Sequence, residues 1–197
     1  DPYNPFEEEL QLTRHALELI DAYQCGVAAA TKSDLIARDI DLYRLIQDHS
    51  PVICKLTVTT TDDALAEKIE PHAPPPSRRL RALEELAKAG IFSGVLLMPV
   101  LPYVEDSAEN VLSVVDSAAR AGARFVYAAF GVTMRDGQRD YFLDGLDRAF
   151  PGMGERYRKR YGSRYYCSSP RAKELWELFS NRCKELGLLY EMKHIIS

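Results

Sequence analysis

Polar side chains stand where several apolar, strand-like segments of this 197-residue sequence end. Lys32 and Ser33 follow the first segment, and Thr57 and Thr59 close the second. Met98 ends the third. The carboxyl ends of parallel strands meet at one mouth, so we expect these side chains to converge there. One amine and several hydroxyls suit a ligand that bears a carboxylate and a ribose, but they form neither a general acid–base pair nor a metal cluster.

Each of these residues also has a structural interpretation. Lys32 can close a salt bridge to Asp34 or Glu70, and strand threonines often serve only as β-branched packing residues. Lys32 can instead be the amine of an enzyme of unrelated chemistry, such as an aldolase or a phosphate-ester enzyme. Glu67, Glu70 and His72 are metal-ligating residue types, but a solvated loop is the favoured interpretation of that stretch.

A basic, aromatic segment spans residues 151–171. It holds six Lys or Arg residues and one acid, a local charge of +5 in a chain of net charge −4. Single-stranded nucleic-acid binding requires cations interleaved with aromatic rings. One possible function of the chain is therefore that of a non-catalytic nucleic-acid-binding module centred on this segment. The alternative is a helix whose tyrosines pack inward while its cations stay solvated. The candidate contact residues are Arg158, Lys159, Arg160, Tyr161 and Arg164.

The composition is that of an ordinary globular protein, with 46% hydrophobic and 27% charged residues. The acidic net charge does not by itself indicate a nucleic-acid binder. The sequence has no apolar run of the roughly 18 residues that a membrane span needs and no secretory leader, so a cytoplasmic protein without a membrane partner is expected. Cysteines 25, 54, 167 and 183 are too far apart for a zinc or iron–sulfur run, and each is predicted to be a buried, reduced thiol.

Hydrophobic periodicity predicts strands that alternate with helices. The expected strands lie near residues 27–31, 52–60, 92–100 and 124–130. The expected helices are 7–23, one capped by Asp39, a short one ending before Pro71, one opened by Ser77, one capped by Ser107, 139–150, 153–161 and one capped by Ser169. Residues 188–196 are either a closing strand or a loose tail.

Regular strand–helix alternation indicates an α/β fold with parallel strands and crossover helices. Neither GxGxxG nor GxxxxGK[ST] follows a strand, which argues against nucleotide-binding open sheets. A complete eightfold barrel needs about 250 residues, so a partial (β/α) barrel fits better. We expect residues 1–134 to form this barrel and residues 135–197 to be a helical C-terminal extension packed on it.

Six short motifs carry a family resemblance. Together they resemble the radical S-adenosylmethionine (SAM) proteins related to spore photoproduct lyase, some of which are labelled DNA repair photolyases. The motifs keep the family's order across nearly the whole chain. They are Asp-Pro-Tyr-x-Pro-x-Glu at 1–7, Thr-Lys-Ser at 31–33, Thr-x-Thr-Thr-x-Asp at 57–62, Glu-Pro-x-Ala-Pro at 70–74, Met-Pro-Val-Leu-Pro at 98–102 and Tyr-Gly-x-x-Tyr-x-Cys-x-Ser-Pro at 161–170.

The resemblance implies a partial barrel that holds a [4Fe–4S] cluster and SAM, and a radical reaction on a nucleic-acid substrate. By this match Lys32, with Ser33 in the same motif, and Thr57 or Thr59 would contact the SAM carboxylate and ribose. Met98 and the backbone of 128–130 would border the adenine. Tyr3 would lie near the strand that presents the methionine amine.

The sequence also departs from this family. The family's CxxxCxxC cluster motif precedes its Asp-Pro-Tyr block, where this sequence begins, so we expect a portion of a longer protein that lacks the cluster ligands and is inactive alone. The four cysteines cannot substitute, because their spacing cannot place three thiolates on one loop. His72 stands where the family usually has Arg. A sheet truncated at its first strand has an unpaired edge, which predicts self-association near 27–31.

Overall fold

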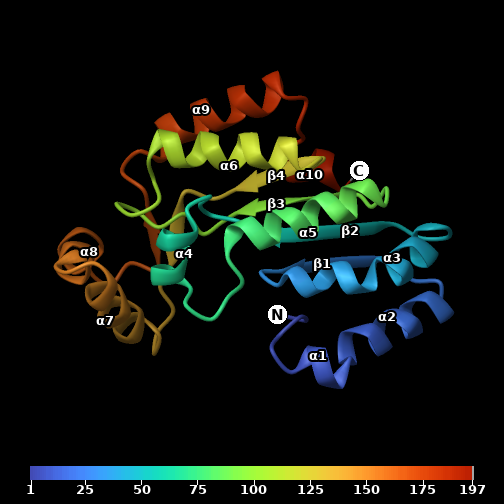
Figure 1. The fold of residues 1–197 in the computed structure, drawn as a ribbon. Helices are drawn as coiled ribbons and strands as arrows, with labels where there is room; N and C mark the ends of the chain where they lie inside the picture. Colours follow the sequence, from blue (N-terminus) through green and yellow to red (C-terminus); the bar gives the residue numbers. More distant parts are fainter. Residues whose placement is uncertain (197) are drawn as a thin grey trace.

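The computed structural model describes residues 1–196, which form two sheets and the helices around them (Figure 1). The main sheet is parallel, with strand order β1-β2-β3-β4. Its strands are β1 (Val27–Thr31), β2 (Val52–Thr57), β3 (Ser93–Leu97) and β4 (Phe125–Ala128). The predicted parallel α/β sheet is therefore confirmed.

The helices and the second sheet complete the chain. Strands β5 (Gly131–Thr133) and β6 (Tyr166–Ser168) pair antiparallel. The helices are α1 (Glu7–Leu10), α2 (Leu12–Ala22), the 3-10 helix η1 (Asp34–Asp39), α3 (Ile40–Gln47), α4 (Asp63–Ile69), α5 (Pro76–Lys88), α6 (Ala108–Arg120), α7 (Arg139–Ala149), α8 (Met153–Tyr161), α9 (Ala172–Glu185) and α10 (Met192–Ile195).

The crossover helices α3, α5 and α6 lie in front of the main sheet (Figure 1). A sequential strand order moves every crossover in one direction, and right-handed crossovers then put their helices on the same face. That face holds the fully buried Cys54, Leu56 and Val95. Because side chains alternate along a strand, Ala30 and Lys55 lie on the opposite face, where Ala30 is exposed and Lys55 half-buried. One face of the sheet is thus packed. The other is open at β1, whereas at β4 it is covered, since Phe125 on the same face as Lys55 is fully buried.

Several element boundaries differ from those predicted. Gln11 is left-handed (φ 50°) and splits the expected helix 7–23 into α1 and α2. Helix α5 begins at Pro76 rather than Ser77, since proline suits the first turn. Asp39 precedes α3 but makes no capping bond, because its carboxylate binds other side chains. Ser169 lies three residues before α9, and its hydroxyl accepts a hydrogen bond from the Arg171 N–H.

The region expected to be a helical extension also contains strand β6, which the periodicity missed. Two hydrophobic clusters organise the molecule. The larger lies between the sheet and its helices and includes Phe179 of α9, and the smaller joins α7, α8 and β6 through Tyr157 and Cys167. Residues 188–196 are neither a full strand nor a loose tail, because Leu189 bridges Phe125 before the short helix α10. The domain boundary after residue 134 stays a prediction.

The cysteine prediction is right for three residues. Cys54, Cys167 and Cys183 are buried and free, and burial raises the pKa of both Cys54 and Cys183 to about 12. It is wrong for Cys25, which is exposed after the end of α2. In the described part of the chain no helix has the length and apolarity that crossing a bilayer requires.

Candidate functional site

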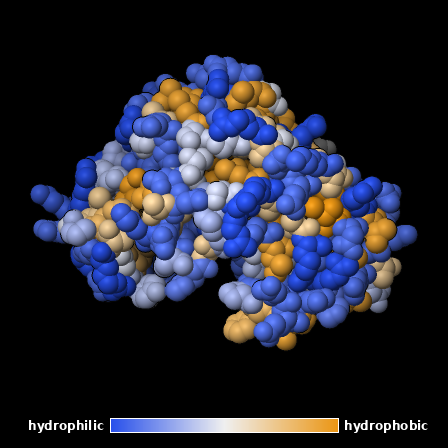
Figure 2. All heavy atoms as spheres, viewed as in Figure 1, coloured by the Kyte–Doolittle hydropathy of each residue, from blue (hydrophilic) through white to orange (hydrophobic). Residues whose placement is uncertain are grey.

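The carboxyl ends of β1 and β2 bring Lys32, Thr57 and Thr59 to one side of the sheet. A cavity of about 740 Å³ opens beside Lys32. Its lining includes Lys32, Ser33, Tyr3 and Glu70, but not the predicted Thr57, Thr59 or Met98. Figure 2 shows the molecule hollowed between the part formed by α7 and α8 and the part formed by α1 and α2. We call this region, from Lys32 to the loop after β3, the mouth.

Lys32 forms an ion pair with Glu70, which confirms one of the two structural partners considered for it. The other oxygen of Glu70 accepts from Arg79 at 2.8 Å. Arg79 is 1% exposed and also donates to the carbonyls of Thr57 (2.9 Å) and Pro74 (2.6 Å). Burial acts to raise the pKa of Glu70, but Lys32 and Arg79 together hold it below its ordinary value. The carboxylate is therefore a fixed counter-charge that positions the Lys32 ammonium.

The predicted threonines lie at the end of β2. Thr57 and Thr59 are both buried. The Thr59 carbonyl accepts from the Asn110 side-chain amide at 2.8 Å, which ties this end to the first turn of α6. Met98 is half-buried just after β3. In the backbone of residues 128–130, the Ala129 carbonyl accepts a hydrogen bond from the Val100 N–H, and the Phe130 carbonyl accepts one from the Ser169 N–H.

Ser33 and the N-terminal residues brace the end of β1. The Ser33 hydroxyl accepts from the Leu35 N–H and caps η1. The Asp1 carboxylate accepts from the Thr31 hydroxyl at 2.6 Å and from the Lys32 N–H at 3.1 Å. Asp1 therefore holds the backbone from which the Lys32 side chain projects, a role that the sequence analysis did not assign.

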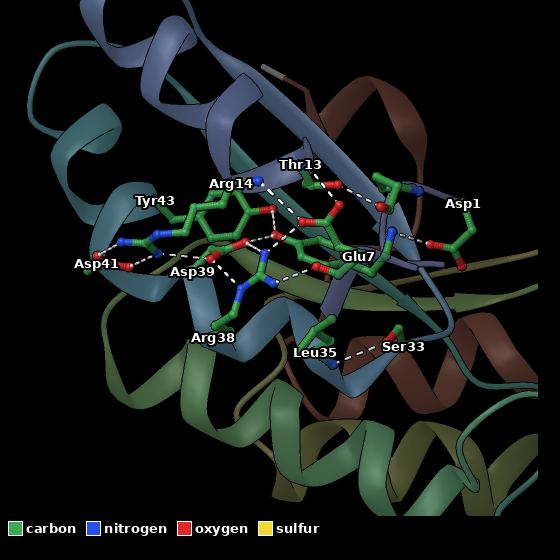
Figure 3. Close-up of polar contacts among 12 residues, drawn as sticks. Asp1, Glu7, Thr13, Arg14, Ser33, Leu35, Arg38, Asp39, Asp41 and Tyr43 are labelled. Atoms are coloured by element: carbon green, nitrogen blue, oxygen red, sulfur yellow. Dashed lines mark hydrogen bonds and ion pairs between the residues drawn. The ribbon is translucent and has the colours of Figure 1, made fainter. Parts of the chain in front are cut away.

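Tyr3 lines the cavity and is anchored in a buried polar network with Asp39 and Tyr43, two residues labelled in Figure 3. Its hydroxyl donates to Asp39 at 3.1 Å and lies 2.9 Å from the Tyr43 hydroxyl. Burial, then the neighbouring Tyr43 and Asp39, raises the pKa of Tyr3 far above its usual range. Arg14 and Arg38 also donate to Asp39. The Tyr3 hydroxyl is thus engaged within the protein, and its ring forms part of the cavity wall.

The loop after β3 brings a carboxyl group that the sequence analysis did not single out. Glu105 is 1% exposed, and its Oε2 accepts from the Leu101 N–H at 2.9 Å. Burial raises the pKa of Glu105 to about 7, and the nearby Glu70 adds to this shift while Thr59 and Lys32 oppose it. Glu105 therefore lies within electrostatic reach of both sides of the mouth.

The basic residues predicted to bind nucleic acid divide into two groups. Lys159, Arg160 and Arg164 are exposed, and none of them forms an ion pair with another residue of 1–196. Arg158 instead pairs with Asp144 and Asp147. Two further exposed rings, Tyr165 (60%) and Tyr166 (48%), follow these cations.

Tyr161 does not lie on this surface with the cations. It is 6% exposed, packs edge-on against Tyr157, and donates from its hydroxyl to the Ser168 carbonyl at 2.7 Å. Its ring is a core element of the α7–α8 part of the molecule rather than a platform open to a base.

The described residues contain no group of three or more His, Cys, Asp or Glu side chains that could hold a metal ion. Glu67 and His72 in particular do not join Glu70, whose oxygens are engaged by Lys32 and Arg79. Glu70 is 15% exposed and belongs to an ion-pair network, so its part of the stretch is not the solvated loop that was predicted.

Comparison with known proteins identifies relatives by sequence and solved structures with a similar fold. No protein-family model matches the chain. An uncharacterized protein of Mycobacterium tuberculosis (strain ATCC 25618 / H37Rv) is 30% identical over 161 residues, 82% of this chain and 47% of that protein. An uncharacterized protein of Methanocaldococcus jannaschii is 34% identical over 106 residues, 54% of this chain and 39% of that protein. The chain thus spans about half or less of the length of these curated relatives.

Two solved structures share the architecture. Spore photoproduct lyase complexed with dinucleoside spore photoproduct aligns with a TM-score of 0.62 at 16% identity, covering 93% of this chain and 56% of that one. The fold resembles a radical SAM partial barrel. The radical SAM methyltransferase TsrM from Kitasatospora setae, with tryptophan substrate and a SAM analogue bound, aligns with a TM-score of 0.56 at 12% identity, covering 92% of this chain and 41% of that one. These likenesses confirm the predicted fold class.

Besides Asp1, three residues that organise the mouth were missed from the sequence. Arg79 sits inside an amphipathic helix, where an arginine is usually solvated, and its burial depends on the Glu70 loop. Asn110 looked like an ordinary first-turn helix residue. Glu105 had a usable signal, since it follows a strand end and lies two residues before the Ser107 cap of α6.

Proposed function

We propose that this chain forms the SAM-binding part of a radical SAM protein that acts on a nucleic-acid substrate. The observation that carries the proposal is that Lys32 and the threonines follow the carboxyl ends of adjacent parallel strands, and that Lys32 lines a cavity of about 740 Å³. An ammonium has three N–H donors and Glu70 engages one of them, so Lys32 retains capacity for a ligand carboxylate.

Relatives of known structure support this assignment. One solved structure of spore photoproduct lyase holds AdoMet together with dinucleoside spore photoproduct, and it aligns with this chain at a TM-score of 0.62. The four-stranded sheet shared with that protein ends at the mouth described here. The match makes SAM and a nucleic acid the ligands to test first.

The [4Fe–4S] cluster that such a function implies does not fit the residues described here. None of the four cysteines is paired with another, and residues 1–196 hold no cluster of metal-ligating side chains. We therefore assign to these residues the binding and orientation of SAM and substrate, and no redox step.

Calorimetric titration with SAM tests the cofactor proposal. Wild type is expected to bind SAM, and Lys32→Gln to bind it about tenfold more weakly, because a charge-assisted hydrogen bond contributes roughly 1.5–3 kcal/mol. The matched control is Lys68→Gln, at an exposed lysine of α4. Absence of SAM binding, or equal affinity of the two variants, would contradict the proposal. Borohydride trapping of a substrate adduct on Lys32 would favour the alternative enzyme of unrelated chemistry.

The surface formed by Lys159, Arg160, Arg164, Tyr165 and Tyr166 is the proposed nucleic-acid contact. Figure 1 shows α7 and α8 on the side toward which the arrowheads of β3 and β4 point, which is the mouth side of the sheet. A strand bound there would be held next to the SAM site. Unpaired cations and exposed rings supply the phosphate attraction and base stacking that this requires.

Salt-dependent binding of a single-stranded oligodeoxynucleotide tests this surface. Replacing Lys159, Arg160 and Arg164 with Ala is expected to weaken binding at least tenfold and to flatten its salt dependence. The control replaces Arg81, Lys173 and Lys184, three exposed cations on other elements, and keeps the net charge equal. Equal losses in the two triple variants would mean that only overall charge matters and would count against the surface.

Self-association through β1 remains a separate proposal. Among the described residues, β1 pairs only with β2, and its outer edge is unpaired. Sedimentation velocity over a hundredfold concentration range is expected to show reversible association that Ala30→Lys reduces. A monomer at all concentrations would contradict it.

A further inference from the structure

His72 is a basic side chain in the wall of the cavity that Lys32 lines. It is exposed, and the same cavity of about 740 Å³ is lined by Lys32 and Ser33. Within residues 1–196 the His72 imidazole has neither a hydrogen bond nor an ion pair. A histidine can carry a positive charge near neutral pH, and both ring nitrogens are then donors. His72 is therefore accessible to a ligand in the cavity and has donors to offer it.

The loop that carries His72 is held at both ends by Arg79. The Arg79 guanidinium donates to the Glu70 carboxylate at 2.8 Å and to the Pro74 carbonyl at 2.6 Å. The Glu70 carbonyl also accepts from the Ala73 N–H at 3.0 Å. Two prolines in this loop each fix one backbone dihedral. The backbone that presents His72 is thus ordered before a ligand binds, which lowers the entropy cost of binding there.

The other basic side chains of the cavity wall are balanced by acids. Arg38 and Arg78 each form ion pairs with carboxylates of the protein. Lys32 pairs with Glu70, so it can donate further hydrogen bonds, but its positive charge is already compensated. Among the described residues, the cavity wall has four basic side chains, and His72 is the one without an acidic partner.

The acids of the cavity wall favour one class of ligand. Besides Glu70 they are Asp34, which pairs with Arg78, and Asp1 and Glu8, which pair with no side-chain cation of residues 1–196. Unpaired carboxylates repel a ligand that carries only negative charge. An oligonucleotide is such a ligand, whereas SAM carries a sulfonium and an ammonium beside its carboxylate. The cavity therefore suits SAM better than a nucleic acid.

The position of His72 places it near Lys32. His72 follows Glu70 by two residues, so their Cα atoms lie within about 7 Å of each other. The Glu70 carboxylate in turn binds the Lys32 ammonium. One small anionic group in the cavity can therefore contact both basic side chains.

We propose that protonated His72 donates a hydrogen bond to the carboxylate of SAM. The proposal rests on the function proposed above and adds a specificity-determining residue to it. Lys32 supplies hydrogen bonds to the same carboxylate, and His72 supplies the positive charge that Glu70 has compensated on Lys32. A ligand that lacks the carboxylate gains nothing from His72.

Calorimetric titration with SAM and with decarboxylated SAM tests this inference. Decarboxylated SAM keeps the sulfonium, the amine and the nucleoside but has no carboxylate. At about pH 6, His72→Gln is expected to bind SAM about three- to fivefold more weakly than wild type, as for a solvent-exposed ion pair. The two proteins should bind decarboxylated SAM equally. The matched control is His15→Gln, at an exposed histidine of α2 outside the cavity wall.

A second variant keeps a cation at position 72. His72→Arg should bind SAM at least as tightly as wild type at about pH 6, and it should lose less affinity than wild type at about pH 8, because arginine stays protonated while histidine ordinarily does not. The other charged groups of the cavity wall are the same in every variant. Differences between the variants therefore report on residue 72.

Three results would overturn the inference, and they separate its failure from that of the proposed function. If SAM binds but His72→Gln behaves like His15→Gln, the inference is wrong and the proposed function stands. The same holds if His72→Gln weakens the binding of SAM and of decarboxylated SAM equally, since His72 would then not contact the carboxylate. If wild type binds neither ligand, both the inference and the proposed function are wrong.

Discussion

Asp39 and Glu105 are both buried acidic residues, but they differ in the number of partners that their carboxyl oxygens have. Beneath the cavity, Asp39 is fully buried and both its oxygens are engaged, by Arg14, Arg38 and Tyr3 (Figure 3). In the loop after β3, Glu105 is equally buried but has only one oxygen bonded, to a backbone N–H. No cation forms an ion pair with Glu105 among the described residues.

The two sites differ in how fully the protein compensates the burial of the carboxylate. Burying a carboxylate is costly unless counter-charges and hydrogen bonds replace its hydration. Asp39 has these replacements, and its partners tie the N-terminal segment and α2 to the start of α3. Glu105 has fewer of them, and burial raises its pKa to about 7 although Thr59 and the Leu101 N–H oppose the shift.

The largest expected effect on stability comes from replacing Asp39, whose carboxyl oxygens are both hydrogen-bonded. Asp39→Asn leaves Arg14 and Arg38 without their shared carboxylate and is expected to lower the free energy of unfolding by about 3 kcal/mol, as measured by urea denaturation. The control is Asp41→Asn, since Asp41 also pairs with Arg14 but is 57% exposed. Its loss should stay within about 1 kcal/mol. If Asp39→Asn and Asp41→Asn lowered the free energy of unfolding equally, burial of the Asp39 carboxylate would not matter for stability.

A smaller effect, of opposite sign, is expected from Glu105→Gln at high pH. The folded pKa of about 7 lies above the unfolded value, so the folded protein binds more protons between about pH 4.5 and pH 7. The contribution of Glu105 to stability is fully present below that window and is lost as the pH rises through it. Glu105→Gln should therefore gain on the order of 2 kcal/mol relative to wild type between pH 5 and pH 8.

Urea unfolding at the two pH values, with Glu109→Gln as the control, measures this change. A wild-type and Glu105→Gln difference that does not vary with pH would show that Glu105 ionises normally in the folded protein.

The smallest effect is expected from Lys32→Gln in the absence of ligand. Glu70 keeps its buried partner Arg79, and Lys32 is 38% exposed, so the free energy of unfolding should change by less than about 1 kcal/mol. Thermal and urea unfolding measure this. A loss as large as that of Asp39→Asn would place Lys32 among the anchoring residues and weaken its assignment to a ligand.

The local pattern of apolar residues was sufficient to predict the parallel sheet and its crossover helices. Strands such as Val52–Thr57 are rich in β-branched and other apolar residues, and helices such as Ala108–Arg120 have a clear apolar stripe with a serine cap. Strand Tyr166–Ser168 was missed because three residues carry no periodicity, and it forms only where Gly131–Thr133 is held opposite. The break at Gln11 was also invisible, since nothing in a helical pattern marks a single left-handed residue.

Sequence alone determined which residue types stand at the strand ends, because chain direction and strand periodicity place them there whatever surrounds them. It also supplied the candidate ion pair of Lys32 with Glu70. Tertiary structure alone decided that Arg79 is buried, that Tyr161 faces the core, and that Glu105 lies beside Thr59 with an oxygen free. Burial and hydrogen-bond saturation depend on segments far apart in the chain, so no local pattern contains them.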